Sequence, residues 1–236
     1  MSLDNILFNI AIIGPMLLFS VIAHEIAHGY AALKQGDPTA YQLGRLTWNP
    51  IKHIDPFFTI ILPLIMIVLP GGGVIGGAKP VPVNPRNYRN FKRGDIIVSL
   101  AGVATNALIS IGCVVLIAVL GLIARFAPEA RSVVEIAQGI LVFGVVLNWI
   151  LIIFNLLPIP PLDGSHVMKY LLPPAWSLQY QRIGFFGIFI LLFLMNTRLL
   201  SWWLTPAFVG AQLLLGSAGA ASDLLPHVLA PWGGGR

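Results

Sequence analysis

The chain has 236 residues, of which 57% are hydrophobic and only 10% carry a charge, and its mean hydropathy is +0.85. These values exclude a soluble enzyme held by a single anchor and indicate an integral membrane protein with one domain over residues 1–236. The basic residues behind the net charge of +5 lie in short loops between apolar segments, as membrane topology signals do, so we exclude nucleic-acid binding.

Long hydrophobic segments predict membrane helices at residues 6–33, 96–124, 133–157 and 183–195, the last running on toward Leu204. A further segment at residues 207–221 is short and rich in small residues. We therefore expect an all-α polytopic membrane protein with roughly four to six hydrophobic segments.

An insertion follows the first predicted helix. Residues 57–69 are apolar but short for a span, contain a proline and end before a Pro-Gly-Gly-Gly run, so we expect this segment to be re-entrant or interfacial. In residues 76–85, three prolines prevent a helix. These residues are interpreted either as an edge strand that pairs with a substrate or as an interfacial loop, and both interpretations stay open.

A metal-binding pattern lies at the end of the first hydrophobic segment, where His24, Glu25 and His28 form H-E-x-x-H. Residues four apart on a helix lie about 40° from each other around its axis, so both imidazoles can reach one cation while Glu25 flanks it. A chance match is the alternative. However, a charged side chain at mid-bilayer costs roughly 2.5 to 3.5 kcal/mol and needs a compensating partner. The pattern therefore predicts a zinc hydrolase site.

A catalytic zinc ion usually has three protein ligands and one position for water, so a third ligand is required. Cys113 is the single cysteine and lies in an apolar run, which leaves histidine and carboxylate ligands. Asp163 is the best candidate because it follows the prolines that break the segment ending at Leu157. At membrane depth, an aspartate and the free backbone groups of a broken helix must both face protein or a water-filled cavity. The alternatives are a surface turn at Asp163 and a rival ligand in His166.

Two motifs together resemble the site-2 proteases, the family of intramembrane zinc metalloproteases, in its compact form. The pattern described above matches the family's H-E-x-x-H, and residues 155–164 match its N-x-x-P-x-x-P-L-D-G at every specified position. The resemblance implies one Zn²⁺ per chain, a catalytic base and a group near the scissile peptide. The residues implied for these roles are, in turn, the ligands His24, His28 and Asp163, the base Glu25, and Asn155.

The resemblance also covers a helix motif and has departures. Ala101, Gly102 and Asn106 resemble the family's A-G-P-x-x-N, but Val103 replaces the proline. No PDZ domain or earlier transmembrane helix is recognisable, so we expect no regulation through a PDZ domain. The family resemblance implies a three-helix catalytic core near residues 6–33, 95–125 and 133–165, followed by C-terminal helices near residues 181–221.

The resemblance implies hydrolysis of a peptide bond in or near a transmembrane segment of another protein, as in regulated intramembrane proteolysis. The partners would be that substrate and the lipid bilayer, and the oligomeric state stays open. One alternative is a metallohydrolase acting on lipids or prenylated peptides. Another is a metal-binding transporter or scaffold, in which Glu25 would be a fourth ligand.

The two halves of the predicted site also constrain the topology. His24 to His28 and Asp163 both lie at the C-terminal ends of their segments, so these segments must run in the same direction. With residues 57–69 re-entrant, one side carries most of the basic residues, against Arg125 and Arg131 in the next loop. Because positive residues favour the cytoplasm, the N-terminus is expected outside and the zinc nearer the cytoplasmic face of a bacterial or archaeal cell membrane.

Other polar residues are expected to serve structure. Asn106 and Asn148 lie in apolar segments and are expected to form interhelical hydrogen bonds. Asp55, beside His53, is expected to cap a helix.

Overall fold

The computed structural model describes residues 3–61, 77–195 and 197–219. Four of its helices are long and apolar enough to cross a membrane, or up to five if the bent pair Pro174–Ile183 and Gly187–Leu194 forms one span. No strand occurs within the described ranges. The predicted all-α polytopic membrane fold is therefore confirmed.

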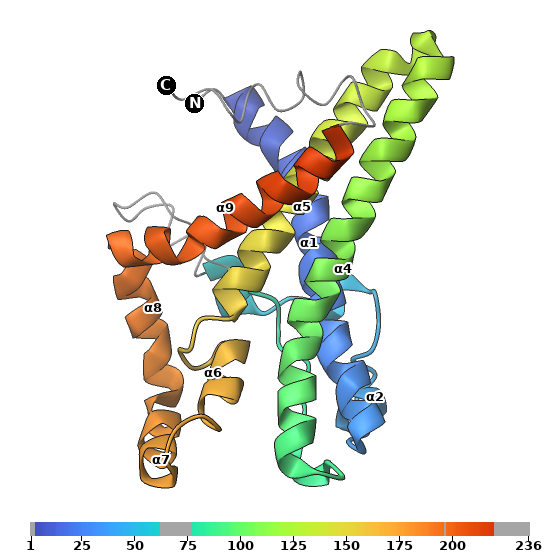
Figure 1. Cartoon of the computed structure of the whole chain (residues 1–236). Coiled ribbons are helices and arrows are strands. Elements are labelled where there is room, and N and C mark those ends of the chain that lie inside the picture. The colour runs from blue at the N-terminus through green and yellow to red at the C-terminus, as the bar shows by residue number, and fades with distance from the viewer. Residues whose placement is uncertain (1–2, 62–76, 196, 220–236) are drawn as a thin grey trace. The chain divides into compact units, whose positions relative to one another are not determined.

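Among the described residues, helices of 25 to 36 residues are joined and followed by shorter ones (Figure 1). The long ones are α1 (Leu3–Gln35), α4 (Phe91–Phe126) and α5 (Arg131–Asn155). Between α1 and α4 lie α2 (Thr39–Gln42), η1 (Pro50–His53), the π-helical η2 (Pro56–Ile61) and η3 (Pro85–Asn87). After α5 come α6 (Asp163–Met168), α7 (Pro174–Ile183), η5 (Gly184–Phe186), α8 (Gly187–Met195) and α9 (Arg198–Gly219).

The residues group into two compact units, which are described one at a time. The first unit contains Met1–Ser20, Asn106–Ile152 and Thr205–Arg236, and the second contains Val21–Thr105 and Ile153–Leu204. The helices α1, α4, α5 and α9 contribute residues to both.

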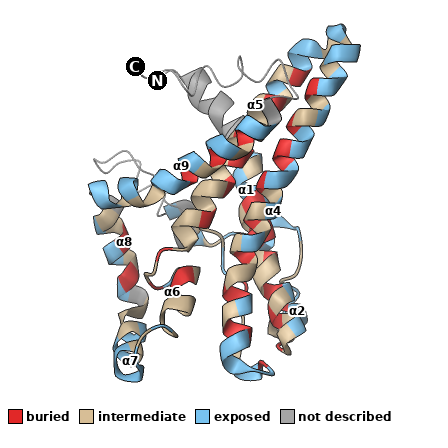
Figure 2. Ribbon diagram, in the orientation of Figure 1, coloured by how far each residue is buried: buried red, intermediate tan, exposed pale blue. Residues whose placement is uncertain are grey.

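In the first unit, α1 and α5 run in the same direction and α4 runs in the opposite one (Figure 1). Small residues bring these helices together: a Cβ on Gly144 of α5 would lie 2.9 Å from the Met16 Cε and 3.1 Å from the Cys113 Sγ. Large apolar side chains such as Leu108 and Leu213 remain exposed, and Figure 2 shows exposed residues along the outer faces of α4 and α9. A bilayer can cover such faces.

Buried amides in the first unit bear out one of two expectations. The Nδ2 of Asn148 donates to the Ser20 Oγ at 3.0 Å and to the Gly144 carbonyl at 2.8 Å, which confirms an interhelical bond. Asn106 is fully buried, but neither its amide nitrogen nor its oxygen has a hydrogen-bond partner in the described part of the chain. The interhelical bond expected for Asn106 is therefore wrong, because burial on a helix face does not by itself supply a partner.

In the second unit, the buried carboxylate of Asp37 ties the insertion to the end of α1. It accepts hydrogen bonds from the Asn84 backbone N–H at 2.6 Å, the Asn87 Nδ2 at 2.8 Å and the Thr39 hydroxyl at 2.5 Å. The Arg89 N–H donates to the Gln35 carbonyl at 2.8 Å. Donors to an ionised carboxylate form some of the stronger hydrogen bonds in proteins. These bonds bring residues 77–84 back alongside α1.

The insertion is only partly described. Residues 57–61 belong to η2, whereas residues 62–76 lie outside the described ranges, so the re-entrant segment stays a prediction. Residues 77–84 have neither helical nor strand structure, which favours the loop interpretation over the edge strand. Asp55 directly precedes η2 and its carbonyl accepts the Thr59 N–H at 2.8 Å, so it occupies the position expected for a cap.

The C-terminal helices differ from their predicted boundaries. The segment expected to run past Met195 toward Leu204 is interrupted, because the Thr197 hydroxyl and N–H both donate to the Leu194 carbonyl, at 2.7 and 2.9 Å. Residues 198–204 instead begin α9, which continues through Pro206 and includes residues 207–219 of the predicted fifth segment, while residues 220–221 lie outside the described ranges. Upstream, the helix predicted near residue 181 already begins at Pro174, since proline is favourable in a first helical turn.

Removing the carboxylate of Asp37 should weaken the connection between the insertion and the end of α1. Burial raises the pKa of Asp37, but hydrogen bonds from Asn84, Thr39 and Asn87 outweigh it, so the pKa lies below its ordinary value of 3.8. The stabilisation is therefore present above the ordinary pKa of 3.8 and is lost as the pH falls through the lower pKa of the folded protein. We expect Asp37→Ala to lower the free energy of unfolding at pH 7 by about 2 to 3 kcal/mol, measured by thermal or denaturant unfolding in detergent.

A matched control for Asp37→Ala is Glu129→Ala, which removes an exposed acid. It should leave stability within about 0.5 kcal/mol of the wild type. Equal stability of the Asp37→Ala variant and the wild type at pH 7 would show that the tie contributes nothing.

Candidate metal centre

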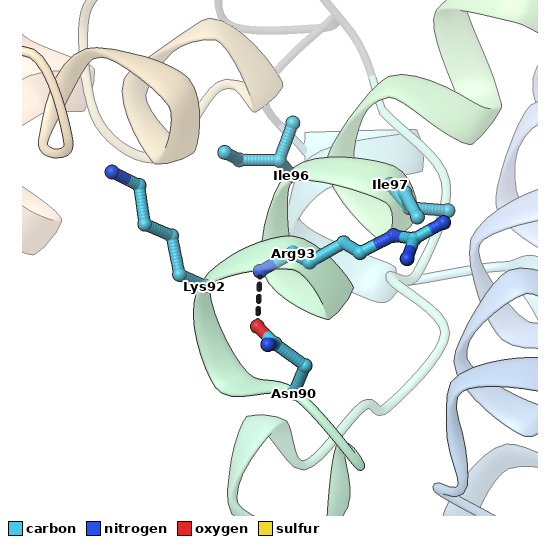
Figure 3. Close-up of a pocket in the computed structure, with 5 residues that line it drawn as sticks. All are labelled: Asn90, Lys92, Arg93, Ile96 and Ile97. Carbon is cyan, nitrogen blue, oxygen red and sulfur yellow. Dashed lines mark hydrogen bonds between the residues drawn. The ribbon is translucent and has the colours of Figure 1, made fainter.

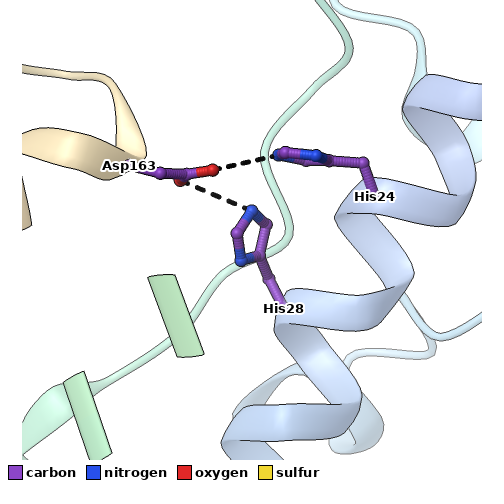
Figure 4. Close-up of side chains that lie close together, drawn as sticks. All are labelled: His24, His28 and Asp163. Atoms are coloured by element: carbon purple, nitrogen blue, oxygen red, sulfur yellow. Dashed lines mark ion pairs between the residues drawn. The ribbon is translucent and has the colours of Figure 1, made fainter. Parts of the chain in front are cut away.

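Three potential ligands from two helices meet in the second unit (Figure 4). His24 and His28 lie one turn apart on α1, and Asp163 is the first residue of α6. The His24 Nε2 lies 3.2 Å from the Asp163 Oδ2, and the His28 Nε2 lies 3.5 Å from the Asp163 Oδ1. One ligand atom from each residue lies within 4.8 Å of the other two. The structure thus brings together the three residues that were predicted as zinc ligands.

These distances fit a zinc ion. Nitrogen and oxygen ligands lie about 2.0 to 2.1 Å from zinc, so neighbouring atoms of a tetrahedral set are about 3.4 Å apart. The two nitrogen-to-oxygen distances, 3.2 and 3.5 Å, are close to that separation, and each histidine faces a different oxygen of the Asp163 carboxylate. The side chains are only 8%, 12% and 17% exposed for His24, His28 and Asp163, so a carboxylate and two imidazoles face each other with little water. A divalent cation would compensate this buried set.

The helix α4 orients both imidazoles. The His28 Nδ1 lies 2.7 Å from the Val98 carbonyl oxygen. Because a carbonyl can only accept, Nδ1 carries a proton, and Nε2 is the ring nitrogen that could bind a metal ion in the cluster. Next to His24, a Cβ on Gly102 would lie 2.4 Å from the ring Cε1. Only glycine therefore allows the His24 ring to lie against the backbone of α4.

The chain between α5 and α6 returns Asp163 to the histidines. The helix α5 ends at Asn155, two residues before the predicted Leu157, because Pro158 follows. The chain then turns, and the Leu162 N–H donates to the Ile159 carbonyl at 2.9 Å. A Cβ on Gly164 would lie 2.3 Å from the Leu156 carbonyl oxygen. The glycine of the L-D-G sequence thus lets α6 begin directly against this turn.

Glu25 is not part of the three-residue cluster found among the described residues. Its Oε2 accepts the backbone N–H of Val81 at 2.7 Å. Val81 belongs to the irregular residues 77–84 and is buried. The insertion therefore holds the Glu25 carboxylate while its sequence neighbour His24 faces Asp163.

The other candidates occupy different places. Asn155 is the half-buried last residue of α5. His166 lies on α6, but its Nδ1 faces the Asp95 carboxylate at 3.3 Å and it does not join the cluster, so Asp163 is favoured over this rival. His53 is buried, and its Nε2 lies 2.8 Å from the Thr47 carbonyl oxygen. In the sequence, Gly102 stands out only as part of a helix motif, and nothing marks Val98 or Val81, because these two act through backbone groups.

A cavity of about 340 Å³ lies at the start of α4 (Figure 3). It is lined by Asn90, Lys92, Arg93, Ile96 and Ile97. The Oδ1 of Asn90 accepts the Arg93 N–H at 2.9 Å and so caps the helix. The cavity contains none of the three clustered residues, and we do not assign it to the reaction.

Filling the space at Gly102 should disturb His24 directly. We expect Gly102→Ala to reduce the zinc content of the purified protein several-fold, because the added methyl group overlaps the imidazole. The measurement is metal content per chain by elemental analysis.

Gly112→Ala is the matched control, since a Cβ there meets nothing within 4 Å on the same helix. Both changes raise helix propensity equally. If both variants keep full zinc, the contact between Gly102 and His24 does not constrain the site.

Comparison with known proteins identifies relatives across most of the chain. The profile of Peptidase family M50 matches residues 118–195. YwhC of Bacillus subtilis (strain 168) is 35% identical over 213 residues, covering 86% of this chain and 90% of that protein. Rip2 of Mycolicibacterium smegmatis is 33% identical over 186 residues, covering 79% of this chain and 67% of that protein. Both relatives are provisionally named zinc metalloproteases. No solved structure matches the chain.

The extent of the match with YwhC, together with the profile match, settles the family. It also confirms the resemblance drawn from the two sequence motifs. This chain belongs to peptidase family M50, the site-2 proteases, and is an integral membrane protein of the zinc metalloprotease type.

Proposed function

We propose that this protein is an intramembrane endopeptidase that hydrolyses a peptide bond in or near a transmembrane segment of another membrane protein, in regulated intramembrane proteolysis. The observation that carries the proposal is the buried convergence of His24, His28 and Asp163 beside apolar helices. Family membership supports the peptidase chemistry. The membrane helices make a transmembrane segment the substrate that can reach the site by lateral diffusion.

The residues divide the work of hydrolysis. His24, His28 and Asp163 would hold one zinc ion, which when bound supplies Lewis acidity toward water and the scissile carbonyl. Glu25 accepts a proton from the attacking water and gives it to the leaving amide nitrogen. Its Oε2 is held by Val81, so we assign the proton to Oε1. Asn155 donates a hydrogen bond to the substrate peptide near the cleaved bond.

The position of Glu25 favours a hydrolase over a metal carrier. A carrier would gain from a fourth protein ligand around its cation, whereas a hydrolase needs this carboxylate outside the ligand set. Glu25 accepts a hydrogen bond from Val81 of the insertion and is not part of the cluster formed by the described residues. This supports proton transfer as its role.

Residues 77–84 serve to place Glu25. The N–H groups of Lys79, Val81 and Asn84 donate to the His53 carbonyl, Glu25 and Asp37 respectively. Pro80 and Pro82 have no N–H. Most donors of this segment are therefore already used or missing, and we assign it to positioning Glu25 instead of to strand pairing with the substrate.

We further propose that the metal centre lies nearer the cytoplasmic face of a bacterial or archaeal cell membrane. Basic residues gather near the end of α1, in the insertion and at the start of α4, while the loop joining α4 and α5 has fewer. The first group comprises Lys34, Arg45, Lys52, Lys79, Arg86, Arg89, Lys92 and Arg93, and the second comprises Arg125 and Arg131. Positive residues favour the cytoplasmic side.

Variants that remove either the base or a zinc ligand test the proposed chemistry. We expect Glu25→Gln to keep about one zinc per chain and to lose proteolysis by about 10²- to 10⁴-fold, because only proton transfer is removed. Asp163→Ala should bind zinc much more weakly, because only the two histidine ligands remain, and should lose activity. Zinc is measured by elemental analysis, and activity by truncation of a transmembrane protein that copurifies with the variants from membranes.

His166→Ala is the control for a histidine close to the cluster that does not ligate zinc. It should keep more zinc than Asp163→Ala. Normal cleavage by Glu25→Gln would exclude the proposed mechanism, and full zinc in Asp163→Ala would exclude the ligand set.

Cysteine labelling tests the orientation. In a Cys113→Ala background, we expect Tyr41→Cys and Asn90→Cys to react with a membrane-impermeant thiol reagent from the cytoplasmic side, and Glu129→Cys from the outside. All three native residues are exposed. Labelling of positions 41 and 90 from opposite sides would contradict the proposed topology.

A further inference from the structure

A single buried carboxylate connects α4 to the helix that carries Asp163. Asp95 lies in the first turns of α4, and its side chain is only 3% exposed. Its oxygens receive three donors: the Lys169 Nζ at 2.5 Å, the Tyr170 hydroxyl at 2.9 Å and the His166 Nδ1 at 3.3 Å. All three donors come from α6 or from the residues that directly follow it. Asp95 therefore fastens α6 to α4.

This ion pair is sheltered from water. The Lys169 side chain is only 12% exposed, and its Nζ lies 5.0 Å from the centre of the Tyr170 ring and 6.0 Å from that of Phe91. Buried ion pairs are screened much less than exposed ones. Losing one partner of such a pair leaves the other charge buried and uncompensated.

The fold gives α6 few other means to place Asp163. The helix has six residues, and its N-cap residue Leu162 makes no side-chain capping bond. A turn containing prolines precedes it. The residues after Asp163 therefore help to fix its position relative to α1, and three of them bond a single carboxylate, that of Asp95.

One face of α4 contacts every part of the candidate metal centre. Asp95, Val98 and Gly102 are three and four residues apart, so they share that face. Gly102 leaves room for His24, the Val98 carbonyl orients His28, and Asp95 holds the helix of Asp163. The first two contacts act on one ligand each. By the same arrangement, the contact from Asp95 acts on the third ligand, Asp163, through α6.

We propose that Asp95 is a positioning residue of the metal centre, which sets Asp163 against His24 and His28 by holding α6 through Lys169, Tyr170 and His166. This inference rests on the proposed zinc site. Residues that orient metal ligands from outside the ligand set typically change metal affinity ten- to a hundredfold when they are altered. Asp95 does so without touching the ion or the substrate.

The test is zinc affinity of the purified full chain, measured by competition with a chelator. We expect Asp95→Asn to weaken zinc binding roughly ten- to a hundredfold, and Asp95→Glu to restore part of it because the charge returns. Glu135→Gln is the matched control: it also converts an acid to its amide, but in an exposed pair with Arg131 at 3.6 Å. It should leave zinc affinity unchanged.

A double-variant comparison separates positioning from general stability. If Asp95 acts through Asp163, Asp95→Asn should cause no further loss of zinc affinity in an Asp163→Ala background. The same loss in both backgrounds would overturn the proposal, because it would indicate a general structural role. Unchanged zinc affinity in Asp95→Asn would also overturn it.

The outcomes also distinguish this inference from the proposed function. If Asp163→Ala loses zinc and Asp95→Asn does not, the proposed zinc site stands and the role of Asp95 is wrong. If the wild type binds no zinc, both fail. Should Asp95→Asn not fold, Tyr170→Phe removes one donor with little change of shape and should weaken zinc binding two- to tenfold. Unchanged affinity in that variant would then count against the proposal.

Discussion

The burial of carboxylates beside membrane helices constrains the second unit more than any other feature. A buried carboxylate is stable only when donors or a cation compensate its charge. Asp37 and Asp95 each face several donors, and Asp163 faces two histidine nitrogens, from segments distant in the sequence. Because each must be compensated, each also connects two elements. The insertion is thereby joined to the end of α1, α4 to α6, and α6 to α1.

This set of connections explains how short, irregular segments form a defined site. Neither α6 nor residues 77–84 could fix a side chain by regular backbone hydrogen bonding over several turns. They are placed by polar contacts to two long helices, α1 and α4. The long helices are in turn determined by hydropathy and need no polar contacts to form. Rigid helices thus carry the histidines, and the irregular segments supply the aspartate and hold the glutamate.

The two acidic groups near the histidines are distinguished by their surroundings. Asp163 faces both Nε2 atoms, whereas Glu25 is held by a backbone N–H from the insertion. Two carboxylates of similar intrinsic chemistry therefore have different environments within one unit. The difference suits a ligand and a base, respectively, as peptide hydrolysis requires.

Local rules in the sequence determined the apolar helices, the shared face of His24 and His28, and the break that places Asp163 after α5. Hydropathy, helical periodicity and proline sterics act over a few residues, so these features could be read directly from the chain. The same rules misjudged the junction of α8 and α9 and gave Asn106 a partner that it does not have among the described residues. Only the tertiary structure decided that Val98 orients His28, that Gly102 accommodates His24, that Val81 holds Glu25 and that Asp95 anchors α6. His28 and Val98 are 70 residues apart, and Asp95 and Tyr170 are 75 apart. Contacts over such separations depend on how helices pack, and backbone carbonyls and N–H groups leave no pattern of residue types, while Asp95 and Gly102 are visible in the sequence without showing which partners they meet.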